Sequence, residues 1–411
     1  MNSRRQFLRA SAAAGLLPLV RTRANTTAPY TYSEFERRIA RRDFQGMTKY
    51  VLPTPCMLLD LDLFEQNIRK MAAHSKSVGI SVRPHVKVHK SVEVAKRQMA
   101  LGAIGLTAAT IAEAELMSGS GIQGVLWTKQ PASQNNIWRA VSLSKRDPSF
   151  MFVVDAPEVV DWVEQAAVAS KAKCRVAVSV FASMPRQGIE AGQPALTLAQ
   201  KLSSSSHFSF EGYMAYSGNA AHTRGFEARC KRSSEDLAGV RETIELSKKC
   251  GLPVNIVSGG STGTYNIDQN NGLTELEAGS YVFMDTGYWA IGGKDGNEIY
   301  SDFSSALTVL TTVDGKLHPN LVTTDYGNKA MARSTDRVKD KPWLEVGTQG
   351  AEYGALRWKD GAPELKLGDR VEIYPTNLDV STAAYDRYYV TRGDQVIDAW
   401  SIMGRGGAPQ R

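Results

Sequence analysis

Short apolar runs alternate with segments of helical periodicity through the middle of the chain. The apolar runs occupy residues 56–60, 80–85, 105–109, 124–127, 149–155, 174–181, 210–216, 254–260 and 275–282. Segments with a helical pattern lie between them, at residues 63–77, 91–101, 111–118, 157–170, 194–204 and 225–250. Strands that alternate with helices predict parallel βα units. Eight such units, over about 250 residues, form a closed (β/α)8 barrel of the TIM type.

An open, doubly wound sheet is the alternative arrangement of these units. No GxGxxG motif follows the first predicted strand, which argues against a dinucleotide-binding fold. Toward the C-terminus the pattern changes to short strands separated by Asp-Gly, Gly-Asp and Pro turns, at residues 306–311, 321–324, 370–374 and 387–390. We therefore predict an α/β chain with an N-terminal barrel over residues 53–295 and a C-terminal, mainly-β domain over residues 296–411. A lead-in at residues 29–52 precedes them.

The positive charge of the chain is concentrated at its N-terminus. The formal net charge is +7, but five arginines and no acidic residue lie in the first 23 residues. The rest of the chain has 44 basic and 42 acidic residues, so it is nearly neutral and we expect no nucleic-acid partner. No apolar run reaches the roughly 18 residues that a membrane span needs, so we also expect no stable membrane insertion.

Residues 1–28 resemble a bacterial twin-arginine export signal. The paired Arg4 and Arg5 are followed at once by Gln6-Phe7-Leu8 and then by a run of Ala and Leu. This resemblance implies that the twin-arginine export machinery carries the folded protein to the periplasm, with cleavage after Ala24 or near Ala28. A disordered basic N-terminus is the alternative interpretation.

A cluster of basic residues ends an early predicted barrel strand, in the stretch Arg83-Pro84-His85-Val86-Lys87-Val88-His89-Lys90. The carboxyl ends of barrel strands point into the active site of TIM-type enzymes. A lysine that is dehydrated there beside other cations has a lowered pKa and can form a Schiff base. A solvated basic loop is the alternative, because that is the usual fate of a run of charges.

A glycine-rich loop follows a late predicted barrel strand, in the stretch Ser258-Gly259-Gly260-Ser261-Thr262-Gly263-Thr264. Glycines let the backbone approach an anion, and exposed amides with Ser and Thr hydroxyls can bind a phosphate. The loops after strands seven and eight of a barrel are a common phosphate site, although a flexible turn is also possible. A lysine at one strand end and a phosphate site at another together indicate pyridoxal 5′-phosphate.

Several stretches resemble the alanine-racemase-like (fold type III) pyridoxal-phosphate enzymes, in the branch of the D-threonine aldolases and D-serine dehydratases. The resemblance covers residues 53–406 and is most specific in Pro84-His85-Val86-Lys87-Val88-His89-Lys90. It implies that Lys87 carries the cofactor as a Schiff base and that the β-domain closes over the barrel. We assign the other cofactor contacts to Arg186, Tyr216, Gly260, Ser261, Thr262, Gly263 and Tyr281.

The resemblance also implies a divalent metal, held near the C-terminus by a histidine and a second ligand two residues later. The matching positions here are Asn377 and Asp379, which follow Pro375, so the histidine is absent. Oxygen ligands suit Mn²⁺ or Mg²⁺ and are poor for Zn²⁺. If residues 377–379 form a strand, the two side chains share one face. A second departure is Asn219, where the family often has histidine, with His222 three residues on.

The resemblance implies a lyase that acts on a small-molecule substrate, a D-configured β-hydroxy-amino acid. Retro-aldol cleavage is favoured over elimination of the D-serine or D-hydroxyaspartate dehydratase kind, because Asp379 keeps a carboxylate. An amino-acid racemase is an alternative and would need a second base, for which Tyr353 and Tyr385 are candidates. A cofactor-binding protein without catalysis is the non-enzyme alternative. The sequence leaves open a homodimer.

Overall fold

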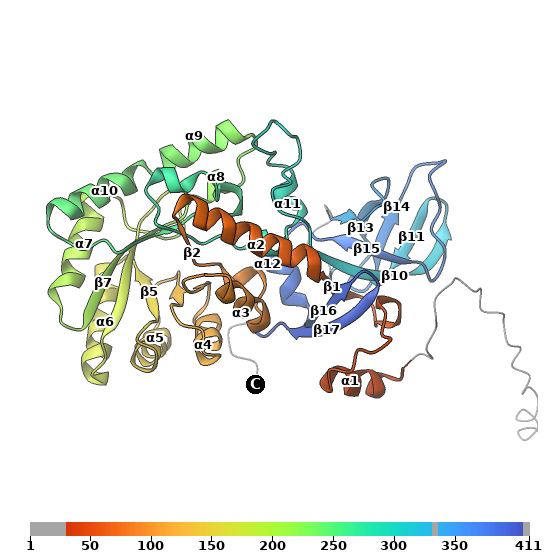
Figure 1. The fold of residues 1–411 in the computed structure, drawn as a ribbon, viewed down its shortest axis with the longest axis horizontal. Helices are drawn as coiled ribbons and strands as arrows, with labels where there is room; N and C mark the ends of the chain where they lie inside the picture. The colour runs from red at the N-terminus through yellow and green to blue at the C-terminus, as the bar shows by residue number, and fades with distance from the viewer. Residues whose placement is uncertain (1–29, 331–335, 406–411) are drawn as a thin grey trace, which may run out of the picture. The chain divides into compact units, whose positions relative to one another are not determined.

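The computed structural model describes residues 30–330 and 336–405, in two compact units, Met1–Gly46 and Met47–Arg411 (Figure 1). The predicted export signal at residues 1–28 lies outside the described residues. The described part of the first unit contains helix α1 (Tyr32–Ala40). Thr31 caps this helix by accepting from the backbone of Glu34, whose side chain in turn accepts from Thr31.

The barrel is an eight-stranded, parallel sheet in the order β2-β9-β8-β7-β6-β5-β4-β3. Its strands are β2 (Ser81–Val82), β3 (Thr107–Ala108), β4 (Leu126–Trp127), β5 (Met151–Val154), β6 (Cys174–Ser179), β7 (Phe208–Ala215), β8 (Ile256–Gly259) and β9 (Glu275–Leu276). A parallel bridge between His85 and Thr107 closes the sheet, and the Thr107 amide donates to the Pro84 carbonyl at 2.9 Å. The prediction of a TIM-type barrel is confirmed.

Helices alternate with these strands along the chain (Figure 1). They are α2 (Leu61–Val78), α3 (Val92–Ala100), α4 (Ile111–Gly119), α5 (Gln134–Arg146), α6 (Pro157–Ser170), α7 (Gln193–Ser204), α9 (Phe226–Asp236) and α10 (Ala238–Lys249), with one-turn helices α8 (Gly218–Ala221) and α11 (Thr286–Trp289). All four residues of β5 are buried, as expected for a parallel strand covered on both faces. The core therefore lies between the barrel and its helices.

Three details of the barrel differ from the prediction, and the first is helix α5 (Gln134–Arg146), which was not among the predicted helices. The run at residues 56–60 is a strand, β1 (Cys56–Asp60), but it belongs to the sheet of the C-terminal part and not to the barrel that we placed at residues 53–295. The predicted single helix over residues 225–250 is two helices, because the backbone leaves helical geometry at Leu237, where φ is −93° and ψ is 2°.

The C-terminal sheet has nine strands in the order β11-β14-β13-β12-β15-β10-β1-β16-β17. Its other strands are β10 (Leu307–His318), β11 (Leu321–Thr324), β12 (Arg337–Val338), β13 (Glu345–Thr348), β14 (Gly354–Arg357), β15 (Arg370–Tyr374), β16 (Arg387–Arg392) and β17 (Gln395–Ser401). All its pairings are antiparallel except that of β1 with β16. The mainly-β character predicted for this part is confirmed.

Short helical turns connect these elements and position the site. They are α12 (Leu378–Ser381) and the 3-10 turns η1 (Lys49–Val51), η2 (Val86–Val88), η3 (Thr262–Thr264), η4 (Asp268–Asn271), η5 (Ser280–Val282) and η6 (Thr382–Ala384). Four of them, η2, η3, η5 and α12, carry residues predicted to act in the site. No helix among residues 30–330 and 336–405 is long and apolar enough to cross a membrane.

Candidate active site

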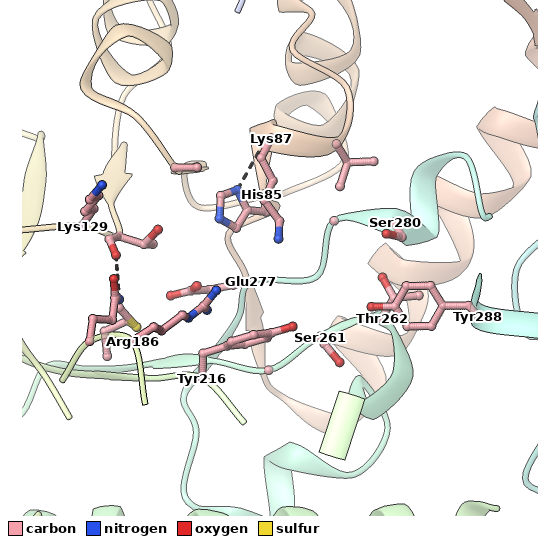
Figure 2. Close-up of a pocket in the computed structure, with 17 residues that line it drawn as sticks. His85, Lys87, Lys129, Arg186, Tyr216, Ser261, Thr262, Glu277, Ser280 and Tyr288 are labelled. Atoms are coloured by element: carbon pink, nitrogen blue, oxygen red, sulfur yellow. Dashed lines mark hydrogen bonds between the residues drawn. The ribbon is translucent and has the colours of Figure 1, made fainter. Parts of the chain in front are cut away.

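A cavity of about 350 Å³ opens at the carboxyl ends of the barrel strands (Figure 2). Its lining comes from the segments that follow β2, β3, β4, β6, β7, β8 and β9, together with α11. The carboxyl end of a barrel is where active sites of this architecture lie. The lining includes six of the predicted site residues, which are Lys87, Arg186, Tyr216, Gly260, Ser261 and Thr262.

Lys87 reaches this cavity from η2. Its backbone amide donates to Nδ1 of His85 at 3.3 Å, and its Nζ forms an ion pair with Oδ2 of Asp379 at 3.1 Å. Burial lowers the pKa of Lys87, but the charge of Asp379 more than offsets this effect, so the pKa is raised overall. The expectation of a lowered lysine pKa is therefore wrong, because the sequence did not show that the β-domain supplies a carboxylate here.

The neighbouring Lys90 points away from the cavity. Its φ of +51° turns the chain, and its buried Nζ donates to the Asp379 carbonyl at 3.1 Å and to the Thr382 hydroxyl at 3.4 Å. Burial lowers the pKa of Lys90. Lys90 therefore anchors the segment that carries Asp379, and Lys87 is the lysine of this motif that lines the cavity.

The glycine-rich loop lines the opposite wall with Gly260, Ser261 and Thr262. Gly260 has φ +77°, and a Cβ there would lie 2.8 Å from Leu276 Cδ2, so only glycine fits. The Thr262 hydroxyl accepts from the Tyr281 amide at 3.0 Å, which holds the turn in place. Gly263 does not line the cavity. It packs so closely on the Ala221 carbonyl that a side chain would clash.

Tyr281 is not part of the cavity lining. It is 2% exposed, and its hydroxyl accepts from Nε2 of Gln98 at 3.0 Å. Its backbone supports Thr262, so Tyr281 has a structural role beside the site rather than a place in it. The sequence analysis placed Tyr281 in the strand-like run 275–282 and assigned it as a cofactor contact, but in the structure it lies on the 3-10 turn η5 with its side chain in the core.

Arg186 and Tyr216 lie together in the cavity wall. The Arg186 guanidinium lies 5.3 Å from the centre of the Tyr216 ring, which is the geometry of a cation–π contact. Burial raises the pKa of Tyr216, so its hydroxyl stays protonated and can donate a hydrogen bond. The structure therefore brings these two predicted residues to the same cavity as Lys87.

Glu277 is a cavity residue that the sequence analysis missed. It is 6% exposed, and Oε1 accepts from the Ser258 hydroxyl at 2.7 Å. Among the described residues no basic side chain lies within ion-pair distance of it, because Arg83 binds Glu275 instead, at 2.7 and 2.9 Å. Burial raises the pKa of Glu277 to about 7. Glu275 and Glu277 lie two residues apart in a predicted apolar strand, so their side chains were expected on the same face. That spacing was the sequence signal that could have identified Glu277 as a site residue.

His85 is a second residue that was not selected. It lines the cavity, and its Nδ1 accepts from the Lys87 amide. Burial, reinforced by the charge of Lys87, holds the pKa of His85 well below its usual range. The ring is therefore neutral, and since Nδ1 accepts, the proton is assigned to Nε2.

The predicted metal ligands do not fit a resident divalent ion. Asn377 is not on a strand as expected. It caps α12, and its Oδ1 accepts from the Val380 amide at 3.2 Å. Asp379 is paired with Lys87, and no group of three His, Cys, Asp or Glu side chains among the described residues is arranged to hold a metal. A divalent cation needs more donors than this pair offers, so we derive no step through a metal.

The tyrosines considered as a second base for racemisation do not line the cavity. Tyr353 is 54% exposed on the C-terminal sheet. Tyr385 is buried, and its hydroxyl donates to the Ala330 carbonyl at 3.2 Å. The β-domain residue that meets Lys87 is instead Asp379.

The cavity fits pyridoxal phosphate by the chemistry of its side chains. Lys87 supplies the amine, and the buried, unpaired Glu277 suits a protonated ring nitrogen, which would compensate its charge. The loop Gly260–Thr262 and Ser280 supply hydroxyls and close backbone at the other end. These residues would hold the cofactor.

Comparisons with known proteins agree with this site. Residues 59–287 match the family "Alanine racemase, N-terminal domain", and residues 306–391 match the family "Putative serine dehydratase domain". A 3-hydroxy-D-aspartate aldolase of Paracoccus denitrificans (strain Pd 1222) is 31% identical over 366 residues, which cover 88% of this chain and 94% of that protein. A D-threonine aldolase of an Arthrobacter species is 32% identical over 356 residues, covering 86% and 93%.

Solved structures give the same result. The crystal structure of D-threonine aldolase from Filomicrobium marinum superposes with a TM-score of 0.83 at 29% identity, covering 87% of this chain and 97% of that one. The relatives are aldolases and dehydratases, so the prediction that this chain is a pyridoxal-phosphate-dependent lyase is confirmed. The chain belongs to the alanine-racemase-like, fold type III family of pyridoxal-phosphate enzymes, in the branch of the D-threonine aldolases and D-serine dehydratases.

Proposed function

We propose that this enzyme cleaves the Cα–Cβ bond of β-hydroxy-D-amino acids by a retro-aldol reaction. The observation that carries the proposal is the 3.1 Å contact between Lys87 Nζ and the Asp379 carboxylate. It puts an oxygen acceptor beside the atom that would bind the cofactor, where the β-hydroxyl of a substrate must lose its proton. When bound, pyridoxal phosphate supplies the electron sink for the pair of electrons from the breaking Cα–Cβ bond.

The residues of this chain would divide the remaining tasks. Asp379 holds the proton that leaves the β-hydroxyl, and Lys87 is placed to return a proton to Cα. His85 is neutral and offers Nε2–H as a hydrogen-bond donor in the cavity wall. Glu277 would keep a compensating negative charge in the buried wall of the cavity. The products are glycine and an aldehyde.

A panel of D-amino acids tests this proposal. We expect D-threonine and 3-hydroxy-D-aspartate to yield glycine with acetaldehyde or glyoxylate, and L-threonine to yield neither. Release of ammonia and a keto acid without glycine would contradict the aldolase proposal and assign a dehydratase. Conversion of D-alanine to its enantiomer would assign a racemase.

Elimination is a second candidate, favoured by one observation. The C-terminal part, residues 306–391, matches a serine dehydratase domain. In that reaction Lys87 takes the proton from Cα and the β-hydroxyl leaves as water after protonation, followed by hydrolysis to ammonia and a keto acid. The same panel separates it from cleavage, because the products share no compound.

We also propose that the protein is exported to the periplasm in the folded state. The support is the Arg4-Arg5 pair followed by Phe7-Leu8. Changing both arginines to lysine keeps the charge but removes the paired guanidinium groups. We expect this variant to remain in the cytoplasm as the uncleaved precursor, and unchanged periplasmic accumulation would contradict the proposal.

A further inference from the structure

One end of the cavity is lined by two cationic side chains that have no acidic partner. Lys129 follows β4, and Arg186 lies in the loop after β6. Neither forms an ion pair with any carboxylate in the described part of the chain. Figure 2 shows both at the end of the cavity opposite Thr262, Ser280 and Tyr288, with Lys87 between the two ends. We call Lys129 and Arg186 the cationic end.

The backbone that carries these two side chains is fixed by hydrogen bonds between the loops. The side-chain Nε2 of Gln187 donates to the Thr128 carbonyl at 2.9 Å, which ties the Arg186 loop to the residue before Lys129. Asp155 binds the Gly188 amide at 2.8 Å, and its own amide donates to Gln130 at 3.2 Å. The residues on both sides of Lys129 and the two residues after Arg186 are therefore held, so the two charges are presented to the cavity together.

The charges of the lining do not balance without an anionic ligand at this end. The ionisable Lys, Arg and Glu side chains of the lining are Lys87, Lys129, Arg186 and Glu277. Lys87 is compensated by Asp379, and Glu277 lies in the buried wall. The α-carboxylate of an amino-acid substrate can pair with one of the two cations at the cationic end. Arg186 suits this carboxylate because its guanidinium group binds a carboxylate with two hydrogen bonds. Lys129 then remains without a partner.

We infer that Lys129 binds a second carboxylate, carried by the β-carbon of the substrate, so that the site selects dicarboxylic β-hydroxy-D-amino acids. This inference rests on the proposed function for its substrate class. It requires that a substrate bound through Lys87 and Arg186 extends its β-substituent along the wall toward Lys129. A substrate with a methyl group at this position would leave Lys129 without an ion-pair partner, so Lys129 would not increase its affinity.

Two unreactive ligands test the inference without using the cleavage reaction. D-aspartate and D-2-aminobutyrate have the same four-carbon chain, and they differ only in a carboxylate or a methyl group on the β-carbon. Neither has a β-hydroxyl, so neither can be cleaved. Dissociation constants are read from the change in cofactor absorbance when each ligand is added to the holoenzyme. We expect D-aspartate to bind about tenfold more tightly than D-2-aminobutyrate.

Variants of Lys129 locate the effect. Lys129→Gln should abolish the preference for D-aspartate without changing the affinity for D-2-aminobutyrate, Lys129→Arg should retain it, and Lys129→Glu should reverse it. Lys173→Gln is the matched control, because Lys173 is exposed just before β6, at the opposite end of the barrel, and the change removes the same charge. Lys129 is exposed, so its variants should fold normally.

The outcomes separate the inference from the proposed function. Equal weakening of both ligands in Lys129→Gln would overturn it, because the lysine would then bind the α-carboxylate. No preference for D-aspartate in the wild-type holoenzyme would overturn it as well. A Lys129-dependent preference in an enzyme that cleaves no β-hydroxy-D-amino acid would support the subsite and refute the aldolase proposal.

Discussion

The two ends of the active-site cavity are built in different ways. At the end formed by Gly260, Ser261 and Thr262, which we call the buried end, the Ser261 and Thr262 side chains are 4% and 1% exposed. Their polar groups are engaged inside the protein, as when the Thr262 carbonyl accepts from the Tyr300 hydroxyl at 2.8 Å. At the cationic end, Lys129 and Arg186 are exposed and their charges have no acidic partner.

This difference separates two requirements of the enzyme. A ligand that is the same in every catalytic cycle is best held by a rigid, preorganised arrangement of buried groups. Little conformational entropy is then lost on binding. A ligand that distinguishes one enzyme from its relatives is best met by exposed residues on loops, which can change at little cost in stability. The buried end therefore suits the cofactor, and the cationic end suits the variable part of the substrate.

Lys87 lies between the two ends, and its loss should have the largest effect. Lys87→Ala removes the amine and should lower turnover by at least about 10³-fold. If the comparison is right, the variant still binds pyridoxal phosphate without a covalent bond, because the buried end is intact. Borohydride reduction of the wild-type holoenzyme, followed by peptide mass analysis, should locate the cofactor on Lys87. Labelling of Lys90 or of the exposed Lys329 would contradict the assignment.

Gly260→Ala should damage the buried end specifically. The new Cβ would meet Leu276 Cδ2 at 2.8 Å and Asp268 Oδ2 at 3.0 Å at a φ of +77°, so we expect a loss of about 2–4 kcal/mol in the free energy of unfolding and weaker cofactor binding. Gly79→Ala is the control. Gly79 has φ +72° and ψ 21°, in the left-handed region, with nothing within 4 Å of the new Cβ, so it reports the backbone strain alone, about 1–2 kcal/mol. Equal losses in the urea-unfolding free energy would refute the steric argument.

Glu277→Gln should change how stability depends on pH. The folded-state pKa of about 7 lies above the ordinary value of 4.5, so the cofactor-free wild type loses stability as the pH rises from about 4.5 to about 7. Glutamine does not titrate and keeps an acceptor for Ser258. We expect the variant to gain on the order of 1–3 kcal/mol relative to wild type between pH 5 and pH 8.

Urea unfolding of the cofactor-free proteins at these two pH values measures this gain. The exposed Glu190→Gln is the control and should show no such difference between pH values. The holoenzyme should behave in the opposite way at pH 8, because the variant has lost the charge that compensates the ring nitrogen. A gain that is identical at pH 5 and pH 8 would show that Glu277 does not titrate in this range.

Metal removal should have the smallest effect. Because Asn377 caps α12 and Asp379 pairs with Lys87, we expect activity after chelator treatment to stay within about twofold of the untreated holoenzyme. Asp379→Asn should nevertheless lower turnover, since it removes the acceptor beside Lys87. Loss of activity on chelation with recovery in Mn²⁺ would contradict this account and restore the metal to the β-domain.

The repeated part of the fold could be predicted because each barrel unit shows its own pattern. A buried run such as Met151–Val154 followed by an amphipathic helix is a local signal, and eight repetitions reinforce it. The sheet to which β1 belongs is not a local property, because an apolar run of five residues fits a barrel strand and a β-domain strand equally well. At the break, neither Leu237 nor Ala238 marks the end of a helix, and Gly239, the nearest glycine, lies inside the first turn of α10.

The site was predictable where one residue type performs one task. Lys87 and Gly260 are examples, because only an amine can hold the cofactor carbon and only glycine fits a φ of +77° beside Leu276. The charge of Lys87 was not predictable, since it depends on Asp379, which lies 292 positions later in the chain and reaches the cavity through tertiary packing. Asn377 was misassigned for a related reason, because a side chain that could bind a metal serves equally well as a helix cap.

The placement of β1 has a consequence for how the chain is assembled. This strand is the first to be synthesised in the described chain, yet it pairs with β10 through Cys56 and Leu310 and with β16 through Met57 and Tyr388. Its partners thus emerge from the ribosome roughly 250 and 330 residues later, tens of seconds at bacterial rates of synthesis. The barrel is complete in sequence before β1 is covered on either edge. A fragment that ends after β9 would therefore leave both edges of β1 open to pairing with other chains. In the complete chain, β10 and β16 cover these two edges.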